Sequence, residues 1–234
     1  MKQEPYYYST RFFDVVYHGG KQTEKCSRSK KRERTNQNEV LMKQSQKKLC
    51  IMLDSIPEFR CRYRIVLRVN YTEDMRRNKV ALEIFVRYLS KPEFNRGNKR
   101  PLFFWKKRYF DDFLEYELLT NARFSFSPEN LSNVIRYLWR KYCGSDEAMI
   151  ERVNFAEEPD VMRKFALSLN DGVPPEKVKT GGRRWGIINR SNYTVVKPEK
   201  KYVSLREIIE IESKAQSRSF TKTVFIKEGD STKK

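Results

Sequence analysis

Three groups of basic residues in this sequence have the types and spacing needed to bind phosphate groups. Guanidinium and ammonium groups bind phosphate oxygens, and an aromatic ring beside them can stack on a nucleic-acid base. The candidate binding residues are Lys30, Lys31, Arg32 and Arg34 in an N-terminal segment, Arg62, Arg64 and Arg68 in an alternating segment, and Arg183, Arg184 and Trp185 in a Gly-rich segment. Together they predict binding of a polyanion.

Each group also has a purely structural interpretation. The N-terminal group can be a solvated tail, and the alternating arginines can lie on a sheet face that helices cover and acidic residues neutralise. Trp185 can be an ordinary core residue. The sequence alone leaves these alternatives open.

The residues needed for metal or nucleophilic catalysis are scarce. The one histidine, His18, ends an apolar stretch before a turn, and the four cysteines (Cys26, Cys50, Cys61 and Cys143) contain no CxxC pair. A zinc site needs closely spaced Cys and His ligands, so none is expected. No phosphate-binding GxxxxGK loop and no nucleophile elbow occurs. We therefore expect no catalytic residues, no metal site and no cofactor.

One group of acidic residues is an alternative candidate for a metal site. Asp111, Asp112, Glu115 and Glu117 stand between basic residues. Carboxylates can hold Mg²⁺ in a nuclease-like arrangement. Acidic residues that balance a basic surface are the interpretation that the composition favours.

The net charge supports a polyanionic partner. The chain has 49 Lys and Arg against 30 Asp and Glu, a formal net charge of +19. Such a charge attracts polyanions, and nucleic acid is the polyanion that releases condensed counterions when it binds. No run of about 18 apolar residues occurs, and the first residues lack a signal-peptide stretch, so no membrane partner and a reducing, cytoplasmic setting are expected.

The order of the expected helices and strands, which position these residues, predicts an α+β fold. Helices are expected over 35–56, 78–90, 127–144, 160–170 and from Ser204, and strands over 61–71, 102–105, 114–119, 122–126 and 149–155. We predict an antiparallel sheet with helices packed mainly on one face. The expected organisation is an aromatic segment and flexible basic arm (1–34), an α+β domain (35–195), and a C-terminal helix with a polar, frayed tail (196–234).

The order of these motifs resembles that of rolling-circle replication initiators of small phages and plasmids, the HUH endonucleases. The resemblance covers about residues 30–190 and rests on the strand ending Leu67–Tyr71, the helix Asn78–Ser90, Glu117, Trp139 and the Gly182–Gly186 segment, which reads Gly-Arg-Arg-Trp-Gly. It implies a five-stranded antiparallel sheet with Ala122–Phe126 at its centre beside Glu117. It also favours DNA over RNA as the partner.

The sequence departs from this family where the family does its chemistry. The resemblance assigns a metal-binding His-x-His pair to Ala122–Phe126, which contains no histidine, and a nucleophilic tyrosine to the helix that contains Phe165. Tyr137 and Tyr142 remain as tyrosines, at positions typical of helix packing. These losses favour binding without cleavage.

Three functions are compatible with the sequence. The first is a DNA-binding relative of the initiators without nicking activity. The second is an active nicking enzyme in which carboxylates hold Mg²⁺ or Mn²⁺ and Tyr137 or Tyr142 attacks the phosphate. The third is a basic protein that associates with RNA or the ribosome.

Overall fold

The computed structural model describes residues 4–9, 13–17, 44–71, 75–172, 183–217 and 223–227. The chain divides into two compact units, a terminal unit (Met1–Ser55 with Val196–Lys234) and a central unit (Ile56–Val195). The sequence predicted one domain over 35–195, whereas the described residues 44–55 belong to the terminal unit. The predicted basic arm, with Lys30, Lys31, Arg32 and Arg34, lies outside the described residues. No described helix is long and apolar enough to span a membrane.

The terminal unit is built around a four-stranded sheet whose strands come from both ends of the chain. Its elements are β1 (Tyr6–Ser9), β2 (Phe13–Tyr17), α1 (Gln44–Asp54), β8 (Lys201–Tyr202), α5 (Leu205–Ser217) and β9 (Thr223–Lys227). The strand order is β8-β1-β2-β9, with β9 parallel to β2 and the other pairs antiparallel. The expectation of a frayed tail is therefore wrong for Thr223–Lys227, which pairs with β2.

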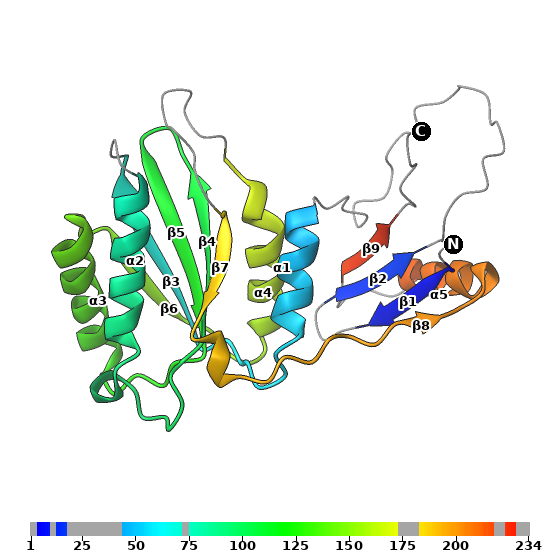
Figure 1. Ribbon diagram of the computed structural model, residues 1–234, viewed down its shortest axis with the longest axis horizontal. Coiled ribbons are helices and arrows are strands. Elements are labelled where there is room, and N and C mark those ends of the chain that lie inside the picture. The colour runs from blue at the N-terminus through cyan, green and yellow to red at the C-terminus, as the bar shows by residue number, and fades with distance from the viewer. Residues whose placement is uncertain are drawn as a thin grey trace. The chain divides into compact units, whose positions relative to one another are not determined.

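The central unit has a five-stranded antiparallel sheet (Figure 1). Its strands and helices are β3 (Tyr63–Asn70), α2 (Met75–Leu89), β4 (Phe103–Tyr109), β5 (Phe113–Thr120), α3 (Pro128–Cys143), β6 (Ala148–Arg152), α4 (Glu158–Leu167) and β7 (Trp185–Ile188). Short 3₁₀ turns cover Pro92–Phe94, Ser168–Asn170 and Arg190–Asn192. The strand order is β6-β3-β5-β4-β7, so β5 is the central strand. The α+β class predicted from the sequence is confirmed.

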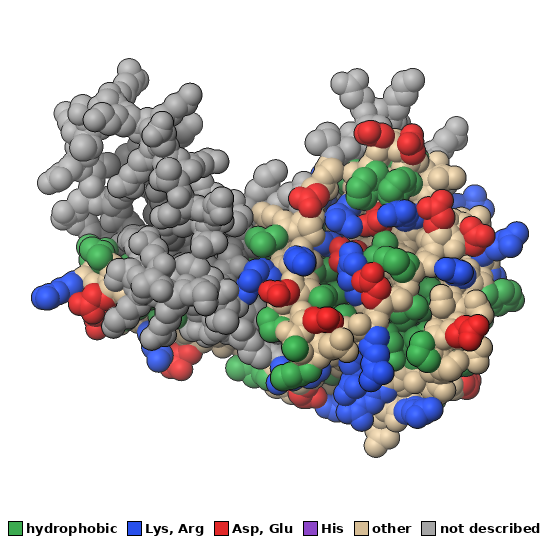
Figure 2. Space-filling view, turned by 180° about the vertical axis from the view of Figure 1, so that it is seen from behind, with side chains coloured by type: hydrophobic (Ala, Val, Ile, Leu, Met, Phe, Trp, Pro, Cys, Tyr) green, Lys and Arg blue, Asp and Glu red, His purple; other side chains and the backbone are tan. Residues whose placement is uncertain are grey.

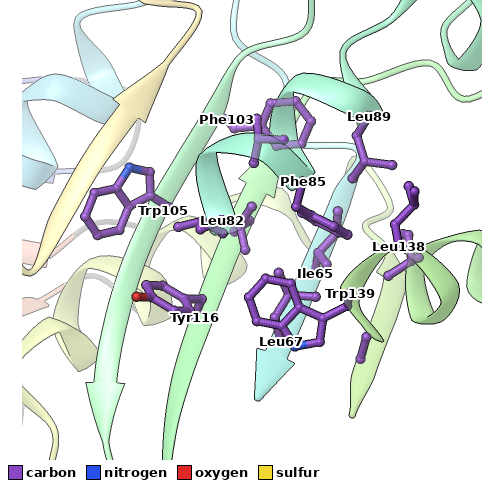
Figure 3. Close-up of a cluster of buried hydrophobic side chains, with 14 of the residues drawn as sticks. Ile65, Leu67, Leu82, Phe85, Leu89, Phe103, Trp105, Tyr116, Leu138 and Trp139 are labelled. Carbon is purple, nitrogen blue, oxygen red and sulfur yellow. The ribbon is translucent and has the colours of Figure 1, made fainter. Parts of the chain in front are cut away.

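The hydrophobic core lies between one face of this sheet and helices α2 and α3, which contact each other (Figure 1). Figure 3 shows Trp139 of α3 inserted among Phe85 of α2, Leu67 of β3 and Tyr116 of β5. Trp139 is fully buried, and its indole N–H donates to the Arg68 carbonyl at 2.8 Å. A buried Trp needs a partner for its N–H group, so this bond fixes α3 over β3.

The second face of the sheet packs against α4. Phe165 and Met162 of α4 are fully buried, and the side chain of Glu158 accepts a hydrogen bond from the Cys61 backbone N–H at 2.8 Å. The helices of the central unit therefore cover both faces of its sheet, with α2 and α3 on one face and α4 on the other.

The strand predicted over Ala122–Phe126 is wrong. This segment makes only an isolated bridge, in which Phe124 pairs with Asn95. Its backbone groups pair with the turn after α2, where Arg96 N–H donates to the Arg123 carbonyl at 2.8 Å. The segment then ends at Ser127, the N-cap of α3. It is therefore too short to form a further strand of the sheet. The resemblance's expectation of this segment at the sheet centre therefore fails, and β5 holds that place.

Helix α3 begins and ends where the sequence predicts. Ser127 has extended backbone angles and its hydroxyl accepts from the Asn130 N–H at 3.4 Å, while Pro128 occupies the first turn. Gly144 ends the helix with φ +74°, a conformation that glycine adopts without a Cβ penalty.

The Ser127 cap gives a first testable prediction. We expect Ser127→Ala to lower the free energy of unfolding by about 1 kcal/mol, because the Asn130 N–H loses its acceptor. Urea unfolding of the full chain measures the effect. Ser191→Ala is the control, since no described residue hydrogen-bonds that exposed hydroxyl, and it should change stability by less than about 0.5 kcal/mol. Equal effects of the two substitutions would contradict the capping role.

Candidate nucleic-acid interface

Arg64 and Arg68 lie on one face of β3, but that face is not an open basic surface. The residues of the central sheet alternate, so those facing away from the α2–α3 core gather on the α4 side. The charged residues on this face are Arg64 and Arg68 of β3, Lys106 and Arg108 of β4, Glu115 and Glu117 of β5, and Glu151 of β6. We call this set the sheet-face charge network.

Glu117 lies at the centre of the network, on the central strand. Its side chain is only 5% exposed, and its two oxygens bind Arg64 Nε at 2.6 Å and Lys106 Nζ at 2.8 Å. Burial alone would raise the pKa of this carboxyl, but Lys106 and Arg64 hold the Glu117 pKa below its ordinary value. Glu117 is therefore an ionised, doubly paired carboxylate.

Lys106 is a fully buried lysine. Its ammonium group binds Glu117, donates to the Phe165 carbonyl at 2.8 Å and donates to the Ser168 hydroxyl. An ammonium group has three donors, so all of them are used. Burial lowers the pKa of Lys106 to about 8, although Glu117 acts in the opposite direction. The side chain links β4 to the end of α4.

Glu115 joins the outer two arginines. One of its oxygens accepts from Arg68 Nε at 3.1 Å, and the other binds Arg108. All four carboxylate oxygens of Glu115 and Glu117 thus face cations. Oxygens occupied in this way are not available to ligate Mg²⁺, and the described residues contain no group of three or more His, Cys, Asp or Glu side chains placed to hold a metal ion.

An open cavity of about 610 Å³ lies between the network and α4. Basic and acidic side chains line it in equal number, namely Arg64, Arg108, Lys164, Glu117, Glu151 and Asp171. A cavity lined with this balance of charge has no strong preference for a phosphate group. Figure 2, which views the molecule from behind, also shows Lys and Arg side chains interspersed with Asp and Glu on the central unit.

Two aromatic rings extend the network at the β4–β5 hairpin. Phe110 and Phe113 stack at 4.7 Å with an interplanar angle of 19°, and the guanidinium of Arg68 lies 4.9 Å from the Phe113 ring. The Arg108 guanidinium lies 5.5 Å from Phe110. Since Arg68 is 47% exposed, it is the arginine of this face with the most freedom to contact an external phosphate.

The described part of the Gly-rich segment begins at Arg183 and leads directly into an edge strand of the sheet. Trp185 begins β7, is half-buried and pairs across the strands with Lys106. Arg183 is exposed, and the Arg184 guanidinium lies 5.3 Å from the Tyr109 ring. A Cβ at Gly186 would lie 2.8 Å from the Trp105 ring, so this glycine permits β7 to approach β4. Trp185 therefore lies in an ordered edge strand, Trp185–Ile188, which pairs with β4.

The structure brings only some of the predicted binding residues together. Arg62 precedes β3 and is exposed, whereas Arg64 and Arg68 are joined to the network by ion pairs. The sequence analysis missed Lys106 and Arg108 as partners of Glu115 and Glu117. Only part of the signal was present. Lys106 and Arg108 are spaced by two residues, as side chains on one face of a strand are, but the strand predicted over 102–105 ends before them, whereas β4 continues to Tyr109.

The chain was compared with protein-family models, with curated proteins and with solved structures, and no match was found in any of the three comparisons. No known relative therefore bears on the function of this chain, which must be inferred from its own sequence and geometry.

Proposed function

We propose that this chain is a nucleic-acid-binding protein, with DNA as the favoured partner, that binds without cutting. The observation that carries the proposal is the net charge of +19. The positive excess is not confined to the arm, because the central unit alone contains 27 Lys and Arg against 18 Asp and Glu. A field of this sign attracts a polyanion to the folded domain as well as to the N-terminal segment.

The resemblance to rolling-circle initiators supplies the preference for DNA. The central unit has a five-stranded antiparallel sheet, as the resemblance implies, but β5 and not Ala122–Phe126 is its central strand. Phe165, at the position where the resemblance implies a tyrosine, packs with its ring 4.7 Å from Lys106 Nζ beside Glu117. The phenyl ring of Phe165 has no oxygen that could attack phosphorus. The Lys106 ammonium group beside this ring is a fixed cation. This arrangement supports binding without nicking.

The geometry gives the nicking alternative little support. Tyr137 and Tyr142 belong to α3, which covers the core face of the sheet. Glu115 and Glu117 lie on the opposite face, paired with cations. A nucleophile and a metal-holding carboxylate must meet at one phosphate, and a sheet separates these two groups.

Salt-dependent DNA binding tests the proposal. We expect the full chain to bind labelled duplex and single-stranded oligonucleotides of about 25 nucleotides, with log K falling linearly as log salt rises. A slope steeper than about −3 would mean that several phosphates are neutralised. Fluorescence anisotropy between ~50 and ~300 mM monovalent salt gives the slope. No binding at the lowest salt, or a slope near zero, would contradict the proposal.

Two further measurements separate the alternatives. Incubation of the labelled single strand with the protein and Mg²⁺ or Mn²⁺ should leave it uncut and free of covalent protein. An adduct that Tyr137→Phe or Tyr142→Phe abolishes would establish the nicking enzyme instead.

A structured RNA added as competitor at equal nucleotide concentration should displace the bound DNA poorly. Preferential binding of the RNA would favour the RNA-associated function.

A further inference from the structure

Helix α3 presents a solvent face that is almost free of acidic residues. Glu129 in the first turn is the only acidic residue between Pro128 and Cys143. The exposed positions of this helix after Glu129 are Asn130, Asn133, Arg136, Tyr137, Arg140 and Lys141. Residues spaced by three, four and seven lie on one side of a helix, so Asn133, Arg136, Tyr137 and Arg140 form a continuous surface.

The basic residues of this surface differ from those of the sheet-face charge network in having no carboxylate partner. Within the part of the chain that the structure describes, Arg136, Arg140 and Lys141 make no ion pair with any carboxylate. Asp146 and Glu147, which follow the helix closely, are exposed and make none with them either. A guanidinium without a carboxylate partner binds phosphate without first breaking an ion pair. These cations are therefore better phosphate ligands than Arg64 or Arg68.

The end of α2 adds a further cation to the same surface. The rings of Tyr88 in α2 and Tyr142 in α3 lie 5.4 Å apart, which brings the ends of the two helices together. Lys91, just after α2, lies over the Tyr88 ring at 4.2 Å, and Lys141 lies 5.9 Å from the Tyr142 ring. We define the α3 basic face as Arg136, Arg140, Lys141 and Lys91.

We propose that the α3 basic face is the surface of the central unit that binds double-stranded DNA. The inference rests on the proposed function, since it names the binding surface and the form of the nucleic acid. A helix of 16 residues is roughly 24 Å long and convex, and the major groove, about 12 Å wide, admits such a helix. Arg and Lys side chains along it reach the flanking phosphates, and Asn133 has the amide group that pairs with adenine.

The arrangement of the aromatic rings favours a duplex over a single strand. Single-strand binding uses open aromatic faces on which bases stack. The Tyr88 and Tyr142 rings lie against each other and under Lys91 and Lys141. These two rings are therefore already engaged. Tyr137, which is 64% exposed, is the one aromatic ring among the exposed residues of α3, and a single ring does not provide a platform for stacking successive bases.

The test compares two charge-matched double variants of the full chain. Arg140→Gln with Lys141→Gln removes two cations from the α3 basic face and leaves good helix formers in their places. Arg100→Gln with Arg190→Gln removes two exposed cations near β7, which lies at the opposite edge of the sheet from β6 and α3. Both variants lower the net charge equally, so a difference between them reports position and not total charge. Thermal unfolding followed by circular dichroism confirms that each is folded.

We expect the α3 variant to bind a 25-base-pair duplex roughly 10- to 100-fold more weakly at ~0.1 M salt, with the log–log salt slope reduced in magnitude by about 2. The control variant should stay within about threefold of the unmodified chain. If both variants bind as the unmodified chain does, the inference fails while the proposed function stands. If the α3 variant loses single-strand binding but keeps duplex binding, the choice of duplex is wrong. If the unmodified chain binds no DNA, the proposed function itself fails.

Discussion

Glu117→Gln is expected to lower the free energy of unfolding by about 3–5 kcal/mol near neutral pH, because it leaves a buried cation without its carboxylate. Glu117 is 5% exposed and Lys106 is 0% exposed, and their charged groups are 2.8 Å apart. The amide keeps the shape of the side chain but removes the negative charge that offsets the burial of Lys106. Urea unfolding of the full chain, followed by circular dichroism, measures the loss.

Glu151→Gln is the matched control for this prediction. Glu151 binds the same guanidinium of Arg64, at 2.9 Å, but its side chain is 48% exposed. Exposed ion pairs contribute about 0–1 kcal/mol, so this loss should be small. Lys106→Met with Glu117→Leu should be less destabilising than Glu117→Gln alone, since it removes both buried charges together. Equal losses for Glu117→Gln and Glu151→Gln would show that burial does not strengthen the Glu117 pairs.

The elements predicted correctly are those whose signal is local. The helix Pro128–Cys143 has a Ser cap, a first-turn proline and a terminal glycine within one continuous segment, and the structure has all three. The strand Tyr63–Asn70 follows from its alternation, in which Tyr63, Ile65, Leu67 and Val69 lie on one face and Arg64 and Arg68 on the other. The helix predicted from Ser204 begins with a capping box, in which the Glu207 N–H donates to the Ser204 hydroxyl at 3.3 Å.

The elements missed are those decided by distant segments. Thr223–Lys227 is short and surrounded by polar residues, and it becomes a strand because β2, some 200 residues earlier, lies beside it. Ala122–Phe126 alternates as a strand does, but the turn after α2 takes its hydrogen bonds. Pairing between such segments depends on the whole fold, and no local pattern of residues contains it.

The candidate site likewise has features that the local sequence predicts and features that depend on distant segments. Alternation placed Arg64 and Arg68 on one face, and the structure agrees. Whether that face is available to phosphate depends on strand register, because register sets Arg68 opposite Glu115 and Glu115 opposite Arg108. A shift of one residue would send these carboxylates to the core face and leave the arginines unpaired. The sequence therefore supplies the charges, and the register decides which of them are already neutralised.

The buried position of Lys106 also predicts how stability depends on pH. Burial lowers the Lys106 pKa to about 8 in the folded chain, against about 10.4 for an unfolded lysine. Below pH 8 both states hold the proton, so the contribution of this group to stability is constant. Between pH 8 and about 10.4 the unfolded chain binds more protons, and the free energy of unfolding from this group must rise with pH.

The contribution of Lys106 to the free energy of unfolding should rise by about 3 kcal/mol between pH 8 and pH ~10.5. This follows from 1.36 kcal/mol for each unit of difference between its folded and unfolded pKa values. Tyr116 acts in the opposite direction, because burial raises its pKa and the unfolded chain then loses that proton first. Comparison with Lys106→Met at each pH removes the tyrosine contribution from the difference. We expect the stability of the unmodified chain relative to Lys106→Met to increase steadily from pH 8 to pH 10.5, measured by urea unfolding. A difference that is flat or falls with pH would mean that Lys106 keeps its proton throughout, held by Glu117 more strongly than burial opposes it.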